Sequence, residues 1–194
     1  MFKKLINIFA VLLFALSIIA CSSGSKKQSR GGVSDPVEEY NTKLKQFRYP
    51  DGTSRPGFTY KKADVQADFD AWAEKNAGTI KEALAKIPAD YLLEIKGHTD
   101  SIGPETAEGK KLGNVHYSEI RAKAVKDALV KKGIDANRMI TKGAGSSSPL
   151  EGIESKDPKN RRVTFSFVKK AEEAKQESSE AKENKETEEK PQNE

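Results

Sequence analysis

The segment IKGHTDSIG, residues 95–103, together with NVHYSEIRA, residues 114–122, is the most informative part of the sequence. The first segment places a carboxylate, Asp100, just after a predicted strand that ends near Gly97. The second places a guanidinium, Arg121, at the start of a predicted helix. Two charges of opposite sign at the ends of neighbouring elements can hold both ends of a small zwitterion. The pattern therefore indicates a binding module rather than an enzyme.

Hydrophobic periodicity predicts the elements around these segments. Apolar residues recur at spacings of three and four over residues 65–86, which predicts a helix with one buried face that Pro88 ends. Residues 91–96 and 162–168 alternate with period two, so each is predicted to form a strand. The predicted buried residues of the helix are Phe69, Trp72, Ala73, Ile80, Ala83, Leu84 and Ile87. We assign Trp72 to this core rather than to ligand stacking.

A second helix is predicted over residues 118–132, with Ser118 as its N-cap and Gly133 as its left-handed exit. Shorter strands are predicted at residues 58–60 and 138–142. The order strand, helix, strand, helix, strand, strand predicts an α+β fold. We expect a two-layer α/β sandwich in which two helices cover one face of a small mixed sheet.

The N-terminal residues are typical of an export signal. Residues 1–20 combine Lys3 and Lys4 with an apolar run that is shorter than the ~20 residues of a membrane span. The segment IIAC, residues 18–21, resembles the lipobox of bacterial lipoproteins, which implies a lipid-modified Cys21, bearing palmitate or a similar acyl chain, at the mature N-terminus. The chain has no other cysteine, so an internal disulfide is excluded. The alternative is a plain secreted protein.

Composition divides the chain into four predicted parts. Residues 1–20 form the signal peptide, residues 21–57 a flexible linker with a partly ordered extension, residues 58–168 the folded domain, and residues 169–194 a disordered charged tail. The tail contains six lysines and nine glutamates, so the net charge of +5 conceals a more basic body. Export and the lack of a nucleic-acid motif favour a negatively charged envelope polymer or membrane surface as the neighbour, and no nucleic acid.

Four motifs occur in one order along residues 58–168: IxGHTDSxG, NxxYSxxRAxxVxxxLxxxG, TxGxGxxxP and NRRV. Together they resemble the OmpA-like peptidoglycan-binding domain, which also occurs in peptidoglycan-associated lipoproteins. In that family a loop aspartate and a helix-start arginine bind the diaminopimelate of the peptidoglycan stem peptide. The matching positions here are Asp100 and Arg121.

The chemistry of this ligand fits these two residue types. The side chain of diaminopimelate ends in both an ammonium and a carboxylate. Asp100 offers a short acceptor to the ammonium, and Arg121 can give the carboxylate two parallel charge-assisted hydrogen bonds. We expect backbone N–H groups at the helix N-terminus to add to the hold on the carboxylate. The alternative is an Asp100–Arg121 salt bridge that only closes the loop against the helix.

Other residues enter the predicted site by similarity. Thr99 and Asn114 are expected to hydrogen-bond the ligand, with turn formation or capping as the alternative. Arg161 lies in phase with the inward-pointing Val163 and is expected to be a secondary contact, whereas Asn160 is expected to be a turn residue.

The segment between the first two motifs departs from the family pattern. Residues 104–113 form a loop that is longer than usual and that adds charged residues beside the predicted pocket, namely Glu105, Glu108, Lys110 and Lys111. This loop can cover the pocket, change its affinity or have no effect on binding.

An enzyme or metal site would have to start from His98, Asp100 and His116. His98 and His116 are the only histidines of the chain, and no further strong ligand follows at a characteristic metal-site spacing. Ser101 and Ser118 have no recognisable base relay. We therefore predict no catalytic residue, no metal and no cofactor.

The resemblance as a whole predicts an outer-membrane lipoprotein whose domain faces the periplasm. Ser22 after Cys21 resembles the lipoproteins that are sent to the outer membrane. The domain is expected to bind peptidoglycan noncovalently through diaminopimelate or an equivalent dibasic residue, and so to link two envelope layers. The alternative is a lipoprotein that acts mainly through an envelope protein partner, as peptidoglycan-associated lipoproteins do with the Tol system.

Overall fold

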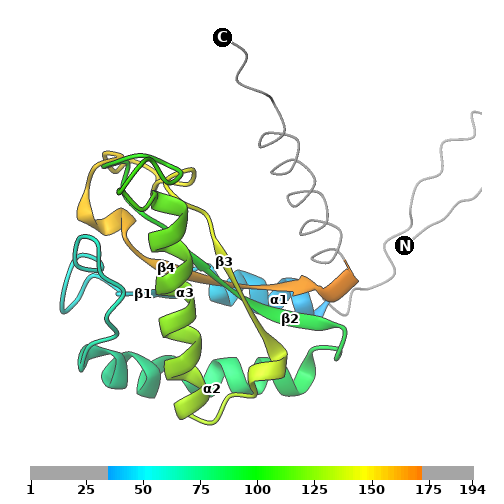
Figure 1. Ribbon diagram of the computed structural model, residues 1–194. Helices are drawn as coiled ribbons and strands as arrows, with labels where there is room; N and C mark the ends of the chain where they lie inside the picture. Colours follow the sequence, from blue (N-terminus) through cyan, green and yellow to red (C-terminus); the bar gives the residue numbers. More distant parts are fainter. Residues whose placement is uncertain (1–34, 172–194) are drawn as a thin grey trace, which may run out of the picture. The chain divides into compact units, whose positions relative to one another are not determined.

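The computed structural model describes residues 35–171, which contain three α-helices and a four-stranded sheet (Figure 1). The elements are α1 (Pro36–Leu44), β1 (Arg48–Tyr49), α2 (Asp68–Lys86), β2 (Tyr91–Gly97), α3 (Asn114–Lys131), β3 (Met139–Gly143) and β4 (Val163–Lys169), with short 3-10 helices η1 (Ala136–Arg138) and η2 (Pro158–Asn160). The predicted signal peptide, Cys21 and most of the predicted tail lie outside the described residues. None of the described helices combines the length and the apolar character that crossing a membrane requires.

The sheet has the strand order β1-β4-β2-β3 and is mixed. β2 runs parallel to β3 and antiparallel to β4, and the short β1 pairs antiparallel with the outer edge of β4. The antiparallel pairing of β2 with β4 places the end of β2 beside the start of β4, with Gly97 opposite Val163. The predicted α+β class with a small mixed sheet is therefore confirmed.

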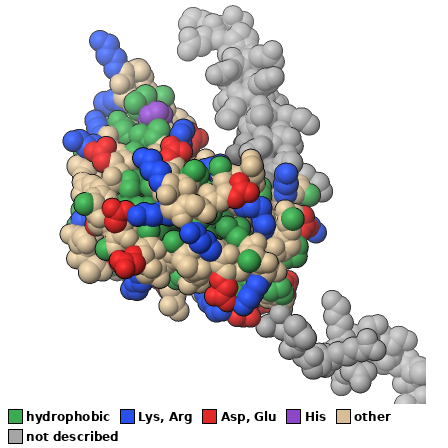
Figure 2. All heavy atoms as spheres, turned by 90° about the horizontal axis from the view of Figure 1, so that it is seen from below, with side chains coloured by type: hydrophobic (Ala, Val, Ile, Leu, Met, Phe, Trp, Pro, Cys, Tyr) green, Lys and Arg blue, Asp and Glu red, His purple; other side chains and the backbone are tan. Residues whose placement is uncertain are grey.

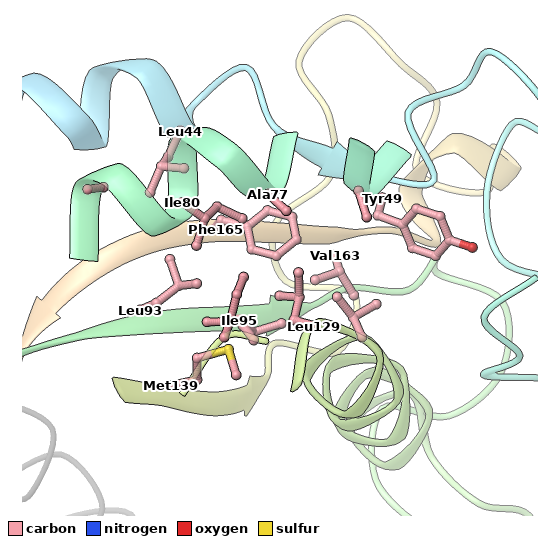
Figure 3. Packing of buried hydrophobic residues seen from close by; sticks show 14 of the residues in the cluster. Leu44, Tyr49, Ala77, Ile80, Leu93, Ile95, Leu129, Met139, Val163 and Phe165 are labelled. Carbon is pink, nitrogen blue, oxygen red and sulfur yellow. The ribbon is translucent and has the colours of Figure 1, made fainter. Parts of the chain in front are cut away.

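One face of the sheet carries the hydrophobic core (Figure 3). Leu93 and Ile95 of β2 pair with Phe167 and Phe165 of β4, and all four side chains are buried on the same face. The helices α2 and α3 both contribute to this core: the ring of Trp72 stacks on Phe165 with centroids 5.2 Å apart, and α3 contributes its buried residues Ala122, Val125 and Leu129. The two predicted helices thus pack on this core, and the helix α1, which the sequence analysis did not predict, adds buried residues to it.

Two glycines let α3 approach the sheet closely. A Cβ on Gly97, at the end of β2, would overlap the Ser118 carbonyl oxygen, and a Cβ on Gly143, at the end of β3, would overlap the Glu119 side chain. The Ser118 side chain also joins α3 to the residues that follow β3, because its hydroxyl donates to Val115 O at 2.7 Å and accepts from Gly145 N at 3.0 Å. The first turns of α3 are therefore held against the ends of β2 and β3.

The segment before residue 58 is more regular than a partly ordered extension. Asp35 caps α1 by accepting a hydrogen bond from Val37 N at 2.9 Å, and Pro36 occupies the first helical turn. The amide of Asn41 acts as a strand partner for Phe167: Phe167 N donates to its Oδ1 at 2.6 Å, and its Nδ2 donates to Phe167 O at 3.0 Å. The core includes four residues of this segment, Val37, Tyr40, Leu44 and Tyr49. Residues 35–57 therefore cover the β4 edge and belong to the folded unit.

Three predicted boundaries are corrected. Residues 58–60 form no strand, because Phe58 makes one backbone hydrogen bond to Arg161 O and otherwise fills the core with its ring. Helix α3 begins at Asn114, four residues before the predicted N-cap Ser118, which lies inside the helix and is fully buried. Strand β4 continues to Lys169, the first residue assigned to the tail, which pairs with Tyr91.

The face shown in Figure 2 has Lys and Arg side chains intermingled with Asp and Glu side chains. On this face the basic residues therefore form no extended patch of positive charge. An extended positive patch is the surface feature that attracts nucleic acid most strongly.

Candidate functional site

All five side chains that the sequence assigns to ligand binding line one pocket of about 160 Å³. They are Thr99, Asp100, Asn114, Arg121 and Arg161. They come from three separate parts of the chain: the loop after β2, the helix α3, and the turn before β4. The sheet brings the first and the third together, because β2 ends where the antiparallel β4 begins. The structure therefore brings these five side chains together at one pocket.

Arg121 is almost completely buried, with 1% of its surface exposed. Its guanidinium donates to three backbone carbonyls: Nε to Lys62 O at 2.9 Å, Nη1 to His98 O at 3.2 Å, and Nη2 to Thr59 O at 3.3 Å. These bonds tie α3 to the end of β2 and to the turn at residues 59–62. Because a guanidinium carries five N–H groups, one on each terminal nitrogen is left for a ligand.

Burial and the neighbouring Arg161 lower the pKa of Arg121 to about 10, and the nearby Asp100 carboxylate partly opposes this shift. Arg121 stays protonated at neutral pH, because this value still lies well above 7. A buried cation next to a second cation is costly. An anionic group in the pocket would relieve that cost, so the electrostatics favour a carboxylate-bearing ligand.

Asp100 pairs with Arg161 rather than with Arg121. Its Oδ2 accepts from Arg161 Nη1 at 2.6 Å, and both side chains are largely buried. Arg161 is fixed in turn by a 2.6 Å hydrogen bond from its Nε to Phe58 O. The expected alternative, an Asp100–Arg121 salt bridge, is not formed. The other carboxylate oxygen of Asp100 accepts only a long 3.4 Å bond from Ile102 N, which leaves it room for an ammonium.

Thr99 carries a buried polar atom without a partner. Its backbone N–H donates to Gly145 O at 2.8 Å, which fixes the loop, but its Oγ1 has no hydrogen-bond partner among the described residues. An unpaired buried hydroxyl costs free energy, and groups of this kind occur at sites that a ligand or water completes. Thr99 is therefore suited to contact a ligand.

Asn114 is the first residue of α3, and its side chain does not cap the helix. Its backbone N–H donates to Pro104 O at 2.9 Å, and Val115 N donates to Glu105 O at 3.0 Å. The loop before the helix thus uses these two N–H groups. The expectation that helix N-terminal N–H groups bind the ligand carboxylate is wrong for these two positions, and Arg121 lies in the second turn rather than the first.

The long loop at residues 104–113 forms one wall of the pocket through Lys111 and Leu112. Backbone hydrogen bonds join Glu108 and Lys111 in both directions, at 3.0 and 2.9 Å. The Glu105 carboxylate accepts from Ser146 N at 3.0 Å and from Ser146 Oγ at 2.5 Å. The loop is therefore held at its base and across its tip, and Glu105 is a structural residue.

The two histidines have different partners. His98 Nε2 lies 2.9 Å from Thr164 Oγ1, and burial, followed by the charges of Arg162 and Lys96, lowers the pKa of His98 to about 3. The His116 ring packs edge-on against Tyr117. Residues 35–171 contain no group of three or more His, Cys, Asp or Glu side chains that could hold a metal ion.

Asn160 is a structural turn residue, as the sequence predicts. Its amide is fully buried; Oδ1 accepts from Leu150 N at 2.8 Å, and Nδ2 donates to Glu154 O and Ser155 O at 2.8 and 3.2 Å. These bonds hold the loop that precedes Arg161.

Sequence reasoning missed several pocket residues, namely Tyr60, Lys61, Ile102, Leu112 and Tyr117. Tyr117 is part of the second motif, so its spacing from Arg121 is a signal that could have revealed it. Tyr60 and Lys61 lie in the turn at residues 59–62, which Arg121 holds beside the pocket by hydrogen bonds to Thr59 O and Lys62 O. The sequence does not show these bonds.

The sequence matches the OmpA family over residues 63–163, which is more than half of the chain. The chain belongs to the OmpA family. The chain is 38% identical over 116 residues to outer membrane porin F of Pseudomonas fluorescens, a match that covers 56% of this chain and 33% of that protein. It is 34% identical over 113 residues to outer membrane protein A of Bordetella avium, which covers 55% of each.

Among solved structures, the fold is similar to the peptidoglycan-associated lipoprotein of Burkholderia pseudomallei, at 23% identity and a TM-score of 0.48, over 69% of this chain and 100% of that chain. The chain spans between one third and about half of the length of these two curated relatives.

Proposed function

We propose that this OmpA family protein binds peptidoglycan noncovalently, by holding the amphoteric side-chain end of diaminopimelate, or of an equivalent dibasic residue, in the pocket of Asp100 and Arg121. It acts as a binding protein and performs no catalysis. The observation that carries this proposal is the convergence of five polar side chains from three parts of the chain on one pocket of about 160 Å³.

The two charges of the ligand find separate partners in this arrangement. The ligand carboxylate meets the unused N–H groups of Arg121, whose three bonds to backbone carbonyls fix its orientation before binding. The ligand ammonium meets the Oδ1 of Asp100, since Oδ2 is taken by Arg161. Thr99 Oγ1 gains the hydrogen bond that it lacks. A preformed pocket of this kind lowers the entropic cost of binding.

The proposal includes the position of the protein in the cell envelope. Cys21 is acylated and tethers the chain to the outer membrane, so that the domain at residues 35–171 reaches the wall from the periplasmic side. This is supported by the lipobox-like segment at residues 18–21 and by relatives that are named as outer membrane proteins. The protein then acts as a mechanical link between the membrane and the wall.

A pull-down with purified sacculi and no other protein tests the function. We expect wild-type protein to sediment with the sacculi, and Asp100→Asn and Arg121→Lys to stay in the supernatant. Asp127→Asn is the matched control, because Asp127 makes only an exposed pair with Lys123. Thermal unfolding of each variant verifies that it is folded.

Two results would overturn the proposal. Folded variants that still sediment with sacculi would show that the pocket is not the binding site. Wild-type protein that sediments only after another envelope protein is added would show that a partner, for example a Tol-like protein, mediates the association. Palmitate labelling of the wild type and of Cys21→Ser tests the anchor separately.

A further inference from the structure

The rim of the pocket is unusually apolar for an exposed surface. The structure exposes four large hydrophobic side chains among its described residues, and three of them, Tyr60, Ile102 and Leu112, line this pocket. Exposed apolar groups that gather at one place mark a binding surface, whereas single scattered ones do not. The amphoteric end of a dibasic residue needs only the charged floor, so the rim has a surface left over for the rest of the ligand.

The rim also carries more positive charge than the ligand's side-chain end requires. Among the described residues, Asp100 is the only carboxylate that lines the pocket, and Arg161 already neutralises it. Lys61 and Lys111 stand on the same lining, and neither forms an ion pair with a carboxylate of the described residues. Together with Arg121 they leave a net positive site, which complements a ligand segment with at least one further carboxylate.

Both parts of the rim are held in place before any ligand binds. On one side, the turn at residues 59–62 is closed by Lys62 N to Thr59 O at 3.0 Å and is gripped by Arg121. Lys61 at its tip has φ 56°, in the left-handed region that residues other than glycine rarely adopt, and strain of this kind gathers at ligand sites. On the other side, Glu105 clamps the base of the loop at residues 104–113 to Ser146.

We propose that this rim is a second subsite, which reads the acidic residue next to the dibasic residue in the stem peptide. Lys61 and Lys111 pair with its free carboxylate, and Tyr60, Ile102 and Leu112 pack on the methylene and methyl groups of the peptide. The inference rests on the proposed function. It makes the site selective for stem peptides whose glutamate carboxylate is free over those in which it is amidated, because an amide has no charge to pair with the lysines.

The test compares two synthetic tripeptides, L-Ala-γ-D-Glu-meso-diaminopimelate and its γ-D-isoglutamine counterpart, with free meso-diaminopimelate as the minimal ligand. Their dissociation constants are measured by calorimetry or NMR titration on the full-length protein. We expect the free-acid tripeptide to bind about two- to fivefold more tightly per pairing lysine than the amidated one, since exposed ion pairs are weak, and the preference to shrink in high salt.

The variants separate the rim from the floor of the pocket. Lys111→Gln and Lys61→Gln should each reduce the preference for the free-acid tripeptide over the amidated one, and Leu112→Ser should weaken both tripeptides alike. Equal affinity of the wild type for both tripeptides, with both still dependent on Asp100, would overturn the second subsite and leave the proposed function intact. Binding of all three ligands by Asp100→Asn at wild-type affinity would overturn the proposed function itself.

Discussion

Replacing Gly97 with alanine should destabilise the protein and disable the pocket together. The added Cβ would overlap the Ser118 carbonyl oxygen. This neighbour is helix backbone, and it cannot yield locally because the Ser118 hydroxyl is bonded to Val115 O and Gly145 N. The helix α3 must therefore move away from the sheet as a body.

The magnitude follows from two opposing contributions. Overpacking in a tight interior costs about 1–3 kcal/mol, and a backbone obstacle puts this site at about 3 kcal/mol. The smaller entropy of the unfolded alanine chain returns roughly 0.5–1 kcal/mol. We expect the free energy of unfolding of Gly97→Ala to fall by about 2 kcal/mol.

Gly78→Ala is the matched control. Gly78 lies inside α2, and an added Cβ there meets no atom within 4 Å. The same substitution should therefore stabilise the protein by about 1 kcal/mol through helix propensity. Urea unfolding at an unchanged m-value measures both.

The same shift of α3 should also carry the Arg121 guanidinium away from its carbonyl partners, because Arg121 follows Ser118 by less than one helical turn. Gly97→Ala should thus bind sacculi more weakly under conditions where it is fully folded. A Gly97→Ala protein that unfolds within about 0.5 kcal/mol of wild type and sediments normally with sacculi would refute this account of how α3 is seated.

Three further predictions concern the loops and the pH dependence. Burial lowers the pKa of His98 to about 3, so below about pH 6.5 the unfolded chain binds a proton that the folded chain does not. The free energy of unfolding should therefore fall by about 2 kcal/mol between about pH 6.5 and pH 5, and His98→Gln should flatten this slope in urea titrations at several pH values. Glu105→Ala should speed amide hydrogen exchange in residues 104–113 and weaken tripeptide binding, and unchanged exchange would show that the clamp to the neighbouring turn is dispensable. Asn160→Ala removes three buried hydrogen bonds and should cost about 3 kcal/mol in urea unfolding, whereas a cost below about 1 kcal/mol would mean that the loop holds its shape without them.

The elements with strong local signals could be predicted from the sequence. The three- and four-residue spacing placed α2 within three residues of its start, and period-two alternation placed β2 and β4 within one residue at each end. Asp35 followed by Pro36 is a helix-start signal that would have predicted α1 as well.

The start of α3 could not be predicted, because Ser118 looks like an N-cap but uses its hydroxyl inside the helix and towards Gly145. The helix begins instead after Gly113, whose position depends on how the loop at residues 104–113 folds back. The predicted strand at residues 58–60 failed for a similar reason. Phe58 is apolar because its ring fills the core beside Tyr49, and not because it joins the sheet.

At the site, the sequence predicted which residues lie there but not which of them pair with each other. The motifs identified five of the polar residues that line the pocket, but not the partners of these five. Arg161 was expected to be a secondary contact, and it is the residue that pairs with Asp100. Arg121 was expected to give a ligand carboxylate two hydrogen bonds, and three of its N–H groups instead bond backbone carbonyls. These pairings depend on where three distant segments meet, which spacing along the chain does not encode.

The most direct test of the central claim is a crystal structure of the full-length protein with the tripeptide L-Ala-γ-D-Glu-meso-diaminopimelate. We predict that the side-chain carboxylate of diaminopimelate lies about 3 Å from a terminal nitrogen of Arg121 and its ammonium about 3 Å from Asp100 Oδ1. A tripeptide bound elsewhere on the protein, with this pocket empty or occupied by the protein's own side chains, would contradict the account.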